Sequence, residues 1–121
     1  STGALLYSYD YTGELLDYTY SDEKAAILVK NEEQRQSQLL LFSKIAAQPA
    51  QVSIPYIAKS VEIDDETAYI LGIHSIDGYA FNGNQTSQLE MTDSYERIMK
   101  NGKYFYLLGY DKINRINANG S

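Results

Sequence analysis

The sequence predicts an all-β protein assembled from antiparallel sheets of short strands. Its 121 residues are 44% hydrophobic and 21% charged, which is typical of one globular domain. Twelve tyrosines stand beside only two prolines, and aromatic residues favour strands over helices. Glycine-containing turn dipeptides separate the strand-like runs at short intervals. These dipeptides are Thr12-Gly13, Asp77-Gly78, Asn82-Gly83, Asn101-Gly102 and Asn119-Gly120.

A repeat of 37 residues organises the second half of the chain. The positions that this shift brings into register are Tyr69-Ile70-Leu71-Gly72 with Tyr106-Leu107-Leu108-Gly109, Ile76 with Ile113, and Asn82-Gly83 with Asn119-Gly120. We therefore expect Tyr69–Ile73 and Tyr104–Gly109 to be equivalent inner strands of consecutive sheets. Truncation of Leu71 or Leu108 to alanine is then expected to cost roughly 2–5 kcal/mol each.

Two further shifts extend the repeat towards the N-terminus. A shift of 70 residues places the run Tyr9 to Gly13 on the run Tyr79 to Gly83, which aligns two turn glycines. A copy of the apolar strand also occurs at Ala26–Val29, 43 residues before Tyr69. The polar stretch 31–36 supplies the insertion that this longer spacing requires.

The predicted strands form one repeat domain over residues 1–121. Two units span 24–66 and 67–101, and partial units cover 1–23 and 102–121. Both prolines fall at strand ends or turns, where a missing N–H is tolerated. In chain order, the expected strands are Leu5–Tyr11, Leu15–Tyr20, Ala25–Asn31, Ser37–Ser43, Ala50–Ile54, Ile57–Ile63, Thr67–Ile73, Gly78–Asn82, Ser87–Thr92, Tyr95–Lys100 and Tyr104–Tyr110.

One segment also fits a helix. Asn31 is a suitable N-cap and residues 34–47 are rich in helix formers, with Leu39, Phe42 and Ala46 on one face. A helix there would make the fold α+β. The strand interpretation is preferred because it keeps the repeat in phase, and short apolar runs are ambiguous by periodicity alone.

A repeat of about 40 residues with four short strands is typical of a blade of a β-propeller. The pattern aromatic-x-aromatic-Thr/Asn-Gly followed by an extended run occurs in Tyr9 to Tyr20 and in Tyr79 to Thr92. This pattern resembles the repeats of quinoprotein-like and WD-like bacterial β-propellers, over most of the chain. Quinoprotein repeats usually carry a tryptophan a few residues past the glycine, where this chain has Asp17. The resemblance therefore implies propeller blades, antiparallel and four-stranded, without a quinone cofactor.

Charge restricts the classes of partner. The net charge is −6, and residues 1–66 carry 11 acids and 5 bases against 5 of each in 67–121, which sums to 16 acids and 10 bases. A net-acidic chain without a basic cluster is a poor ligand for nucleic acid or an anionic membrane. The longest apolar runs fall well short of a membrane span. We expect a bacterial protein with a protein or glycan partner. The sequence leaves the compartment open, with the cell envelope favoured over the cytosol.

Catalytic and cofactor chemistry find little support in the sequence. His74 is the one histidine, and Ser75 and Asp77 lie beside it on what reads as a single extended strand. Neighbours on a strand point to opposite faces, whereas a hydrolytic triad needs groups that converge. The acidic run 62–66 lacks the spacing of a calcium loop and is expected to be a solvated turn. No catalytic residue, cofactor or metal is therefore assigned.

Alternating tyrosines offer a candidate binding surface. Each set alternates with polar residues, so its rings share one face of a strand. Stacked tyrosine rings bind sugars or peptides, although a role in the sheet core is the simpler interpretation. The candidate residues are Tyr7, Tyr9, Tyr11, Tyr18 and Tyr20.

The predicted function is a non-catalytic binding or scaffold module of the β-propeller type, forming part of a larger bacterial protein. An array of about three blades leaves edges that proteins normally cover. Self-association or pairing with the rest of a larger propeller is therefore expected. The alternative is a small α+β inhibitor or immunity-type protein that recognises a basic partner through its acidic half.

Overall fold

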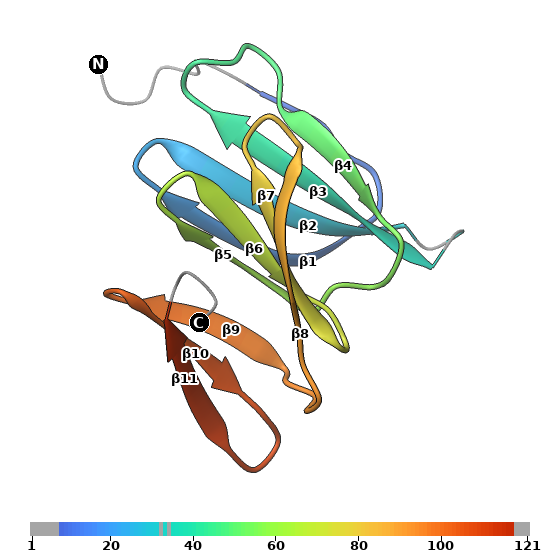
Figure 1. The fold of residues 1–121 in the computed structure, drawn as a ribbon. Helices are drawn as coiled ribbons and strands as arrows, with labels where there is room; N and C mark the ends of the chain where they lie inside the picture. The colour runs from blue at the N-terminus through green and yellow to red at the C-terminus, as the bar shows by residue number, and fades with distance from the viewer. Residues whose placement is uncertain (1–7, 32, 34, 118–121) are drawn as a thin grey trace.

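The computed structural model describes residues 8–31, 33 and 35–117. Within these residues it contains eleven strands and no helix, so the all-β prediction is confirmed (Figure 1). Because the described part of the chain is built of strands, it holds no helix long and apolar enough to span a membrane.

The strands form three antiparallel sheets in which sequence neighbours are also neighbours in space. Sheet 1 contains β1 (Glu14–Ser21), β2 (Lys24–Asn31), β3 (Gln36–Ser43) and β4 (Ala50–Ile54). Sheet 2 contains β5 (Ser60–Asp64), β6 (Thr67–Leu71), β7 (Ser75–Ala80) and β8 (Gln85–Glu90). Sheet 3 contains β9 (Arg97–Asn101), β10 (Tyr104–Leu108) and β11 (Ile113–Asn117).

The helix considered for residues 34–47 is not formed. Residues 36–43 are strand β3, which pairs with β2 on one side and β4 on the other. Leu39, Leu40 and Leu41 are all buried, so both faces of this strand are covered. A strand buried on both faces gives a continuous apolar run, which is why its periodicity resembled that of a helix.

The 37-residue repeat corresponds to the spacing of the sheets. The second strand of sheet 2 is β6 and the second strand of sheet 3 is β10, which confirms that Tyr69–Ile73 and Tyr104–Gly109 begin in equivalent strands. The units 24–66 and 67–101 nevertheless differ from the sheets, since each sheet begins one strand before the corresponding unit. A repeat fixes the spacing of equivalent strands and leaves the first strand of each sheet undefined.

The 70-residue shift aligns turns that are not equivalent. Gly13 precedes the first strand of sheet 1, whereas Gly83 precedes the fourth strand of sheet 2. Both glycines have a positive φ, of 105° and 96°, which residues other than glycine rarely adopt. The shared feature is therefore the turn geometry and not the place in the sheet.

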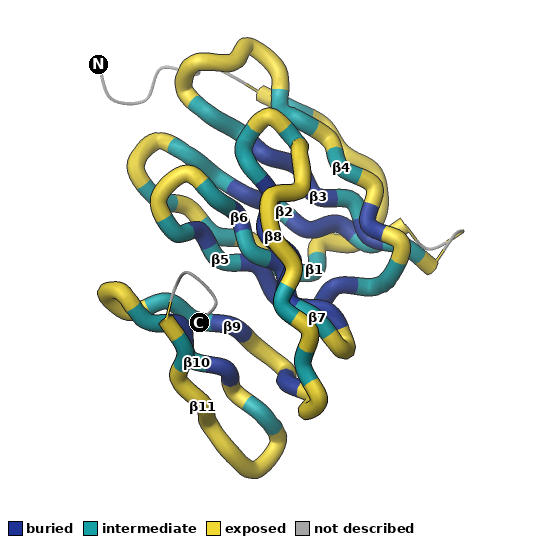
Figure 2. Tube along the Cα trace, viewed as in Figure 1, coloured by how far each residue is buried: buried dark blue, intermediate teal, exposed yellow. Residues whose placement is uncertain are grey.

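Two apolar cores lie between successive sheets. The first joins sheets 1 and 2 through side chains such as Leu28, Leu41 and Ile70. The second joins sheets 2 and 3 around Phe105, with Leu71 and Ile98 beside it. Strands β8 and β11 are exposed along most of their length (Figure 2). Burial therefore depends on the packing of one sheet on the next.

Contacts between sheets concentrate on the first strand of each. Strand β1 packs against β5, and β5 packs against β9 (Figure 1). The carboxylate Oδ2 of Asp17 accepts a hydrogen bond from the N–H of Val61 at 2.9 Å. In the next pair of sheets, Ser60 Oγ accepts a bond from the N–H of Ile98 at 3.2 Å. The same type of polar contact thus joins each first strand to the next.

Candidate functional site

Sheet 1 has an apolar face that no other described sheet covers, although Tyr9 and Gly13 of the segment before β1 lie against Phe42 and Val29 on it. Side chains alternate along each strand, so the neighbours of those packed on sheet 2 point to the opposite side. Val29 and Leu40 are buried, whereas Tyr18 and Tyr20 are largely exposed. We call this surface the free face of sheet 1; it comprises Leu15, Tyr18, Tyr20, Ala25, Ile27, Val29, Leu40 and Phe42.

The five predicted tyrosines do not form one set. Tyr18 and Tyr20 lie together on the free face of sheet 1. Tyr9 contacts the same face, because its ring meets Phe42 edge-on at 5.7 Å between centroids. Its hydroxyl also accepts a hydrogen bond from Gln51 Nε2 at 2.5 Å. Tyr11 is exposed in the segment before β1, and Tyr7 lies outside the described residues.

Sheet 3 carries a second apolar face that was not singled out from the sequence. The face opposite sheet 2 displays two arginines together with large apolar and aromatic side chains. We call it the free face of sheet 3; it comprises Arg97, Met99, Asn101, Tyr104, Tyr106, Leu108, Ile113, Arg115 and Asn117. The 37-residue shift already aligned Leu71 with Leu108 and Ile76 with Ile113, so the signal was present in the sequence.

The only buried acid among the described residues is Asp77, which is 3% exposed. The hydroxyl of Tyr56 donates to its Oδ2, and Ser75 Oγ donates to the same oxygen at 3.4 Å. The other carboxylate oxygen, Oδ1, has no hydrogen-bond partner. His74 is exposed and its described contact is through its backbone carbonyl, which accepts from the N–H of Met91. Asp77 therefore anchors the linker that contains Tyr56, and the three neighbours do not converge as a triad.

Tyr56 links the stability of the fold to alkaline pH. Burial, followed by the hydrogen bond and the charge of Asp77, raises the pKa of Tyr56 well above its usual value of 10.0. Burial also raises the pKa of Tyr69 and Tyr79. The pKa of each of these tyrosines is higher in the folded protein than in the unfolded chain. Their contribution to the free energy of unfolding is therefore complete below pH 10 and is lost as pH rises further.

We therefore expect the free energy of unfolding to fall as pH rises above about 10. Tyr56→Phe should make this fall shallower, because the residue with the largest shift no longer ionises in the unfolded chain. Urea titrations between pH 8 and 11.5 measure the slope in both proteins, and Tyr110→Phe, in an exposed turn, is the control. A wild-type slope that Tyr56→Phe leaves unchanged would contradict this assignment.

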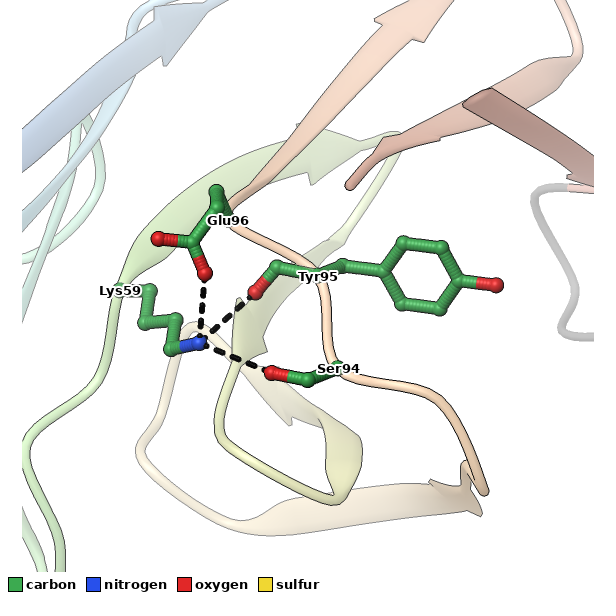
Figure 3. Close-up of polar contacts among 4 residues, drawn as sticks. All are labelled: Lys59, Ser94, Tyr95 and Glu96. Carbon is green, nitrogen blue, oxygen red and sulfur yellow. Dashed lines mark hydrogen bonds and ion pairs between the residues drawn. The ribbon is translucent and has the colours of Figure 1, made fainter. Parts of the chain in front are cut away.

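Lys59 fixes the linker between sheets 2 and 3 (Figure 3). Its ammonium donates to the carbonyl of Tyr95 at 3.0 Å, to Ser94 Oγ at 3.3 Å and to the carboxylate of Glu96 at 2.9 Å. Three acceptors around one cation hold the chain just before β9. This arrangement positions the first strand of sheet 3 beside the first strand of sheet 2.

A groove of about 600 Å³ lies between the turns of sheets 1 and 2. Two ion pairs border it, Lys24 with Glu66 at 3.2 Å and Lys44 with Glu23 at 3.1 Å. Two acids of the run 62–66 pair with different lysines: Glu66 pairs with Lys24, and Asp64 pairs with Lys100 at 2.8 Å. The described residues contain no group of three or more acidic or histidine side chains placed to hold a metal.

Comparison with known proteins identifies the fold alone. No protein-family model and no curated protein matches the chain. Among solved structures, the chain is similar to the crystal structure of the computationally designed Ika4 protein. The identity is 7% and the TM-score 0.52, over 96% of this chain and 99% of that one. At such low identity the likeness concerns the arrangement of strands and not the function.

Proposed function

We propose that this chain is a non-catalytic binding or scaffold module whose three sheets are consecutive blades of a β-propeller. The observation that carries the proposal is the concentration of inter-sheet contacts on the first strands, β1, β5 and β9. Blades radiate from a central axis, so the first strands of neighbouring blades lie closest together. A flat stack of sheets would instead bring corresponding strands together across its whole width.

The path of the chain supports the same architecture. Each sheet is an antiparallel meander, and linkers 55–59 and 91–96 lead from its last strand to the first strand of the next sheet. This is the order of quinoprotein-like and WD-like propellers, which the repeat resembles. Sheet 3 has three strands within the described residues. A fourth strand from another copy, or from the rest of a larger propeller, would complete it.

The surfaces favour binding over catalysis. Large exposed apolar patches on a folded protein usually mark an interaction site. Each free face exposes large apolar side chains: Tyr18 and Tyr20 on sheet 1, and Leu108 and Ile113 on sheet 3. The two sheets that carry them lie on opposite sides of sheet 2 (Figure 1). The inhibitor or immunity-type alternative depended on a helix at 34–47, where the described residues form a strand and a turn.

Binding of a hydrophobic dye tests whether a free face is an accessible binding surface. Wild-type protein at nanomolar concentration is expected to bind bis-anilinonaphthalene sulfonate saturably. The double variant Tyr18→Ser, Tyr20→Ser should bind it more weakly while keeping its far-UV spectrum and melting temperature. Tyr110→Ser is the matched control, because Tyr110 is 98% exposed but lies in a turn outside both free faces. Equal dye binding by all three proteins would contradict the proposal.

A further inference from the structure

We infer that the free face of sheet 3 docks onto the free face of sheet 1 in a second copy of this chain. Two copies joined head to tail in this way would close a ring of six sheets. The inference deepens the proposed function and rests on it, because closure requires blades that turn about an axis. Its evidence is the continuity of the repeat with the two inter-sheet cores already described.

The first step concerns the face that sheet 2 presents to sheet 3. Leu71 and Ile76 belong to the second core and are 0% and 4% exposed. The 37-residue shift carries them to Leu108 and Ile113, which are 39% and 55% exposed on the free face of sheet 3. The side chains that form a core in one sheet thus recur uncovered in the next. At these two positions the free face of sheet 3 therefore repeats the surface by which sheet 2 packs against sheet 3, whereas Arg97 and Arg115 stand where sheet 2 has Ser60 and Gly78.

The second step identifies the face that fits it. In sheet 3, Phe105 and Leu107 are packed against sheet 2. Their equivalents in sheet 2, Ala68 and Ile70, are packed against sheet 1. A further shift of 43 residues leads to Ala25 and Ile27, which lie on the free face of sheet 1. The positions by which sheets 2 and 3 pack against the preceding sheet therefore recur on the free face of sheet 1.

This pairing of unlike faces selects head-to-tail contact. The free face of sheet 3 repeats the surface by which sheet 2 packs against the sheet that follows it. The free face of sheet 1 repeats the surface by which sheets 2 and 3 pack against the sheet that precedes them. Two copies of sheet 3 placed face to face would not reproduce either core. An interface between different surfaces closes into a ring when the rotation permits.

One ion pair of the first core has a candidate counterpart at the inferred contact. In the first core, Lys24 at the start of β2 pairs with Glu66 in the β5–β6 turn. The equivalent of Lys24 in sheet 3 is Tyr104, whose ring carries the guanidinium of Arg115 at 4.4 Å from its centroid. The equivalent turn in sheet 1 holds Asp22 and Glu23, of which Glu23 already pairs with Lys44 of its own chain. A cation on one copy would again meet acidic residues on the other, as in the first core.

The number of copies follows from the size of known propellers. Closed propellers contain about four to eight blades. Two copies of three sheets supply six blades, whereas three copies would supply nine. Two-fold rings are also the commonest closed assemblies of identical chains. A dimer is therefore the expected assembly.

Disulfide formation between designed cysteines tests the contact directly, because the chain has no cysteine of its own. Ser60 and Ile98 touch across the second core. Their equivalents in the new contact are Arg97 of one copy and Tyr18 of the other. The double variant Arg97→Cys, Tyr18→Cys is expected to oxidise to a covalently closed dimer. The control Arg97→Cys, Thr19→Cys should not, because Thr19 points to the opposite face and bonds to Glu62.

The outcomes separate the inference from the proposed function. A ladder of larger species would support docking but contradict closure, and with it the propeller. Free thiols on monomeric protein, or a disulfide within one chain, would overturn docking while leaving the proposed binding role intact. If the double variant does not fold, a mixture of the two single variants is used. The mixed disulfide is then expected at several times the yield of either symmetric one.

Discussion

Replacement of Phe105 by alanine is expected to lower the free energy of unfolding by about 3–5 kcal/mol. The side chain is 1% exposed at the centre of the second core, and its ring meets Tyr69 edge-on at 5.1 Å between centroids. Removal of the ring leaves a cavity between sheets 2 and 3 that the paired strands cannot readily fill. Guanidinium titration at low micromolar concentration, followed by far-UV circular dichroism, measures the loss.

Tyr106→Ala is the matched control for Phe105→Ala. Tyr106 is the next residue of β10 and points to the free face of sheet 3. In dilute protein its truncation should cost less than half as much. Equal losses for the two variants would mean that the two faces of sheet 3 are buried alike, contrary to the structure.

Leu71→Ala is expected to cost about 2–5 kcal/mol, whereas Leu108→Ala should cost less in dilute protein. The two leucines are equivalent in the repeat, and the sequence alone predicted a loss in this same range for both. The structure corrects this expectation, because only Leu71 is covered by a neighbouring sheet. Denaturant titrations of both variants, each compared with wild type at the same protein concentration, give the two losses.

The dependence of the two losses on protein concentration provides a second test of Leu71→Ala and Leu108→Ala. If a second copy covers Leu108, the cost of Leu108→Ala should rise as the protein is concentrated. The cost of Leu71→Ala should change far less. A cost for Leu108→Ala that is already as large as that for Leu71→Ala at nanomolar concentration would contradict the free face of sheet 3.

The sequence predicted most of the strands because the local signals agree. The expected strand Leu5–Tyr11 is an exception, since residues 8–11 are not in a strand and residues 5–7 lie outside the described residues. Turn glycines, tyrosine-rich runs and the 37-residue repeat all favoured short antiparallel strands, and eleven strands are present in the described residues. The segment 36–43 was ambiguous because Leu39, Leu40 and Leu41 are all buried. Its identity as a strand depends on pairing with β2 and β4, which is a tertiary property.

The repeat alone does not predict how the strands are grouped into sheets. Shifts of 37 and 43 residues identify equivalent strands but do not show that each sheet begins with β1, β5 or β9. The bond between Tyr56 and Asp77 likewise joins a linker to a strand 21 residues away. No periodicity in the sequence indicates a contact of that kind.

The candidate surfaces were predicted in part. Alternation of tyrosines identified Tyr18 and Tyr20 on one face of one strand. Tyr9 reaches that face from the segment preceding β1, through Phe42 and Gln51, which alternation does not predict. The free face of sheet 3 needed the repeat and the burial pattern together, because exposure at Leu108 is informative only beside burial at Leu71.

The mass of the protein as a function of concentration tests most directly whether the end sheets are built to cover one another. Sedimentation equilibrium from micromolar to millimolar concentration is expected to show the mass rising from 13.7 kDa to a plateau at twice that value. Leu108→Lys should raise the dissociation constant at least about tenfold, because it removes an apolar side chain from the contact and adds a further cation beside Arg97. Lysine at Tyr110, outside both free faces, should leave it unchanged. A constant mass of 13.7 kDa up to millimolar concentration would contradict the account.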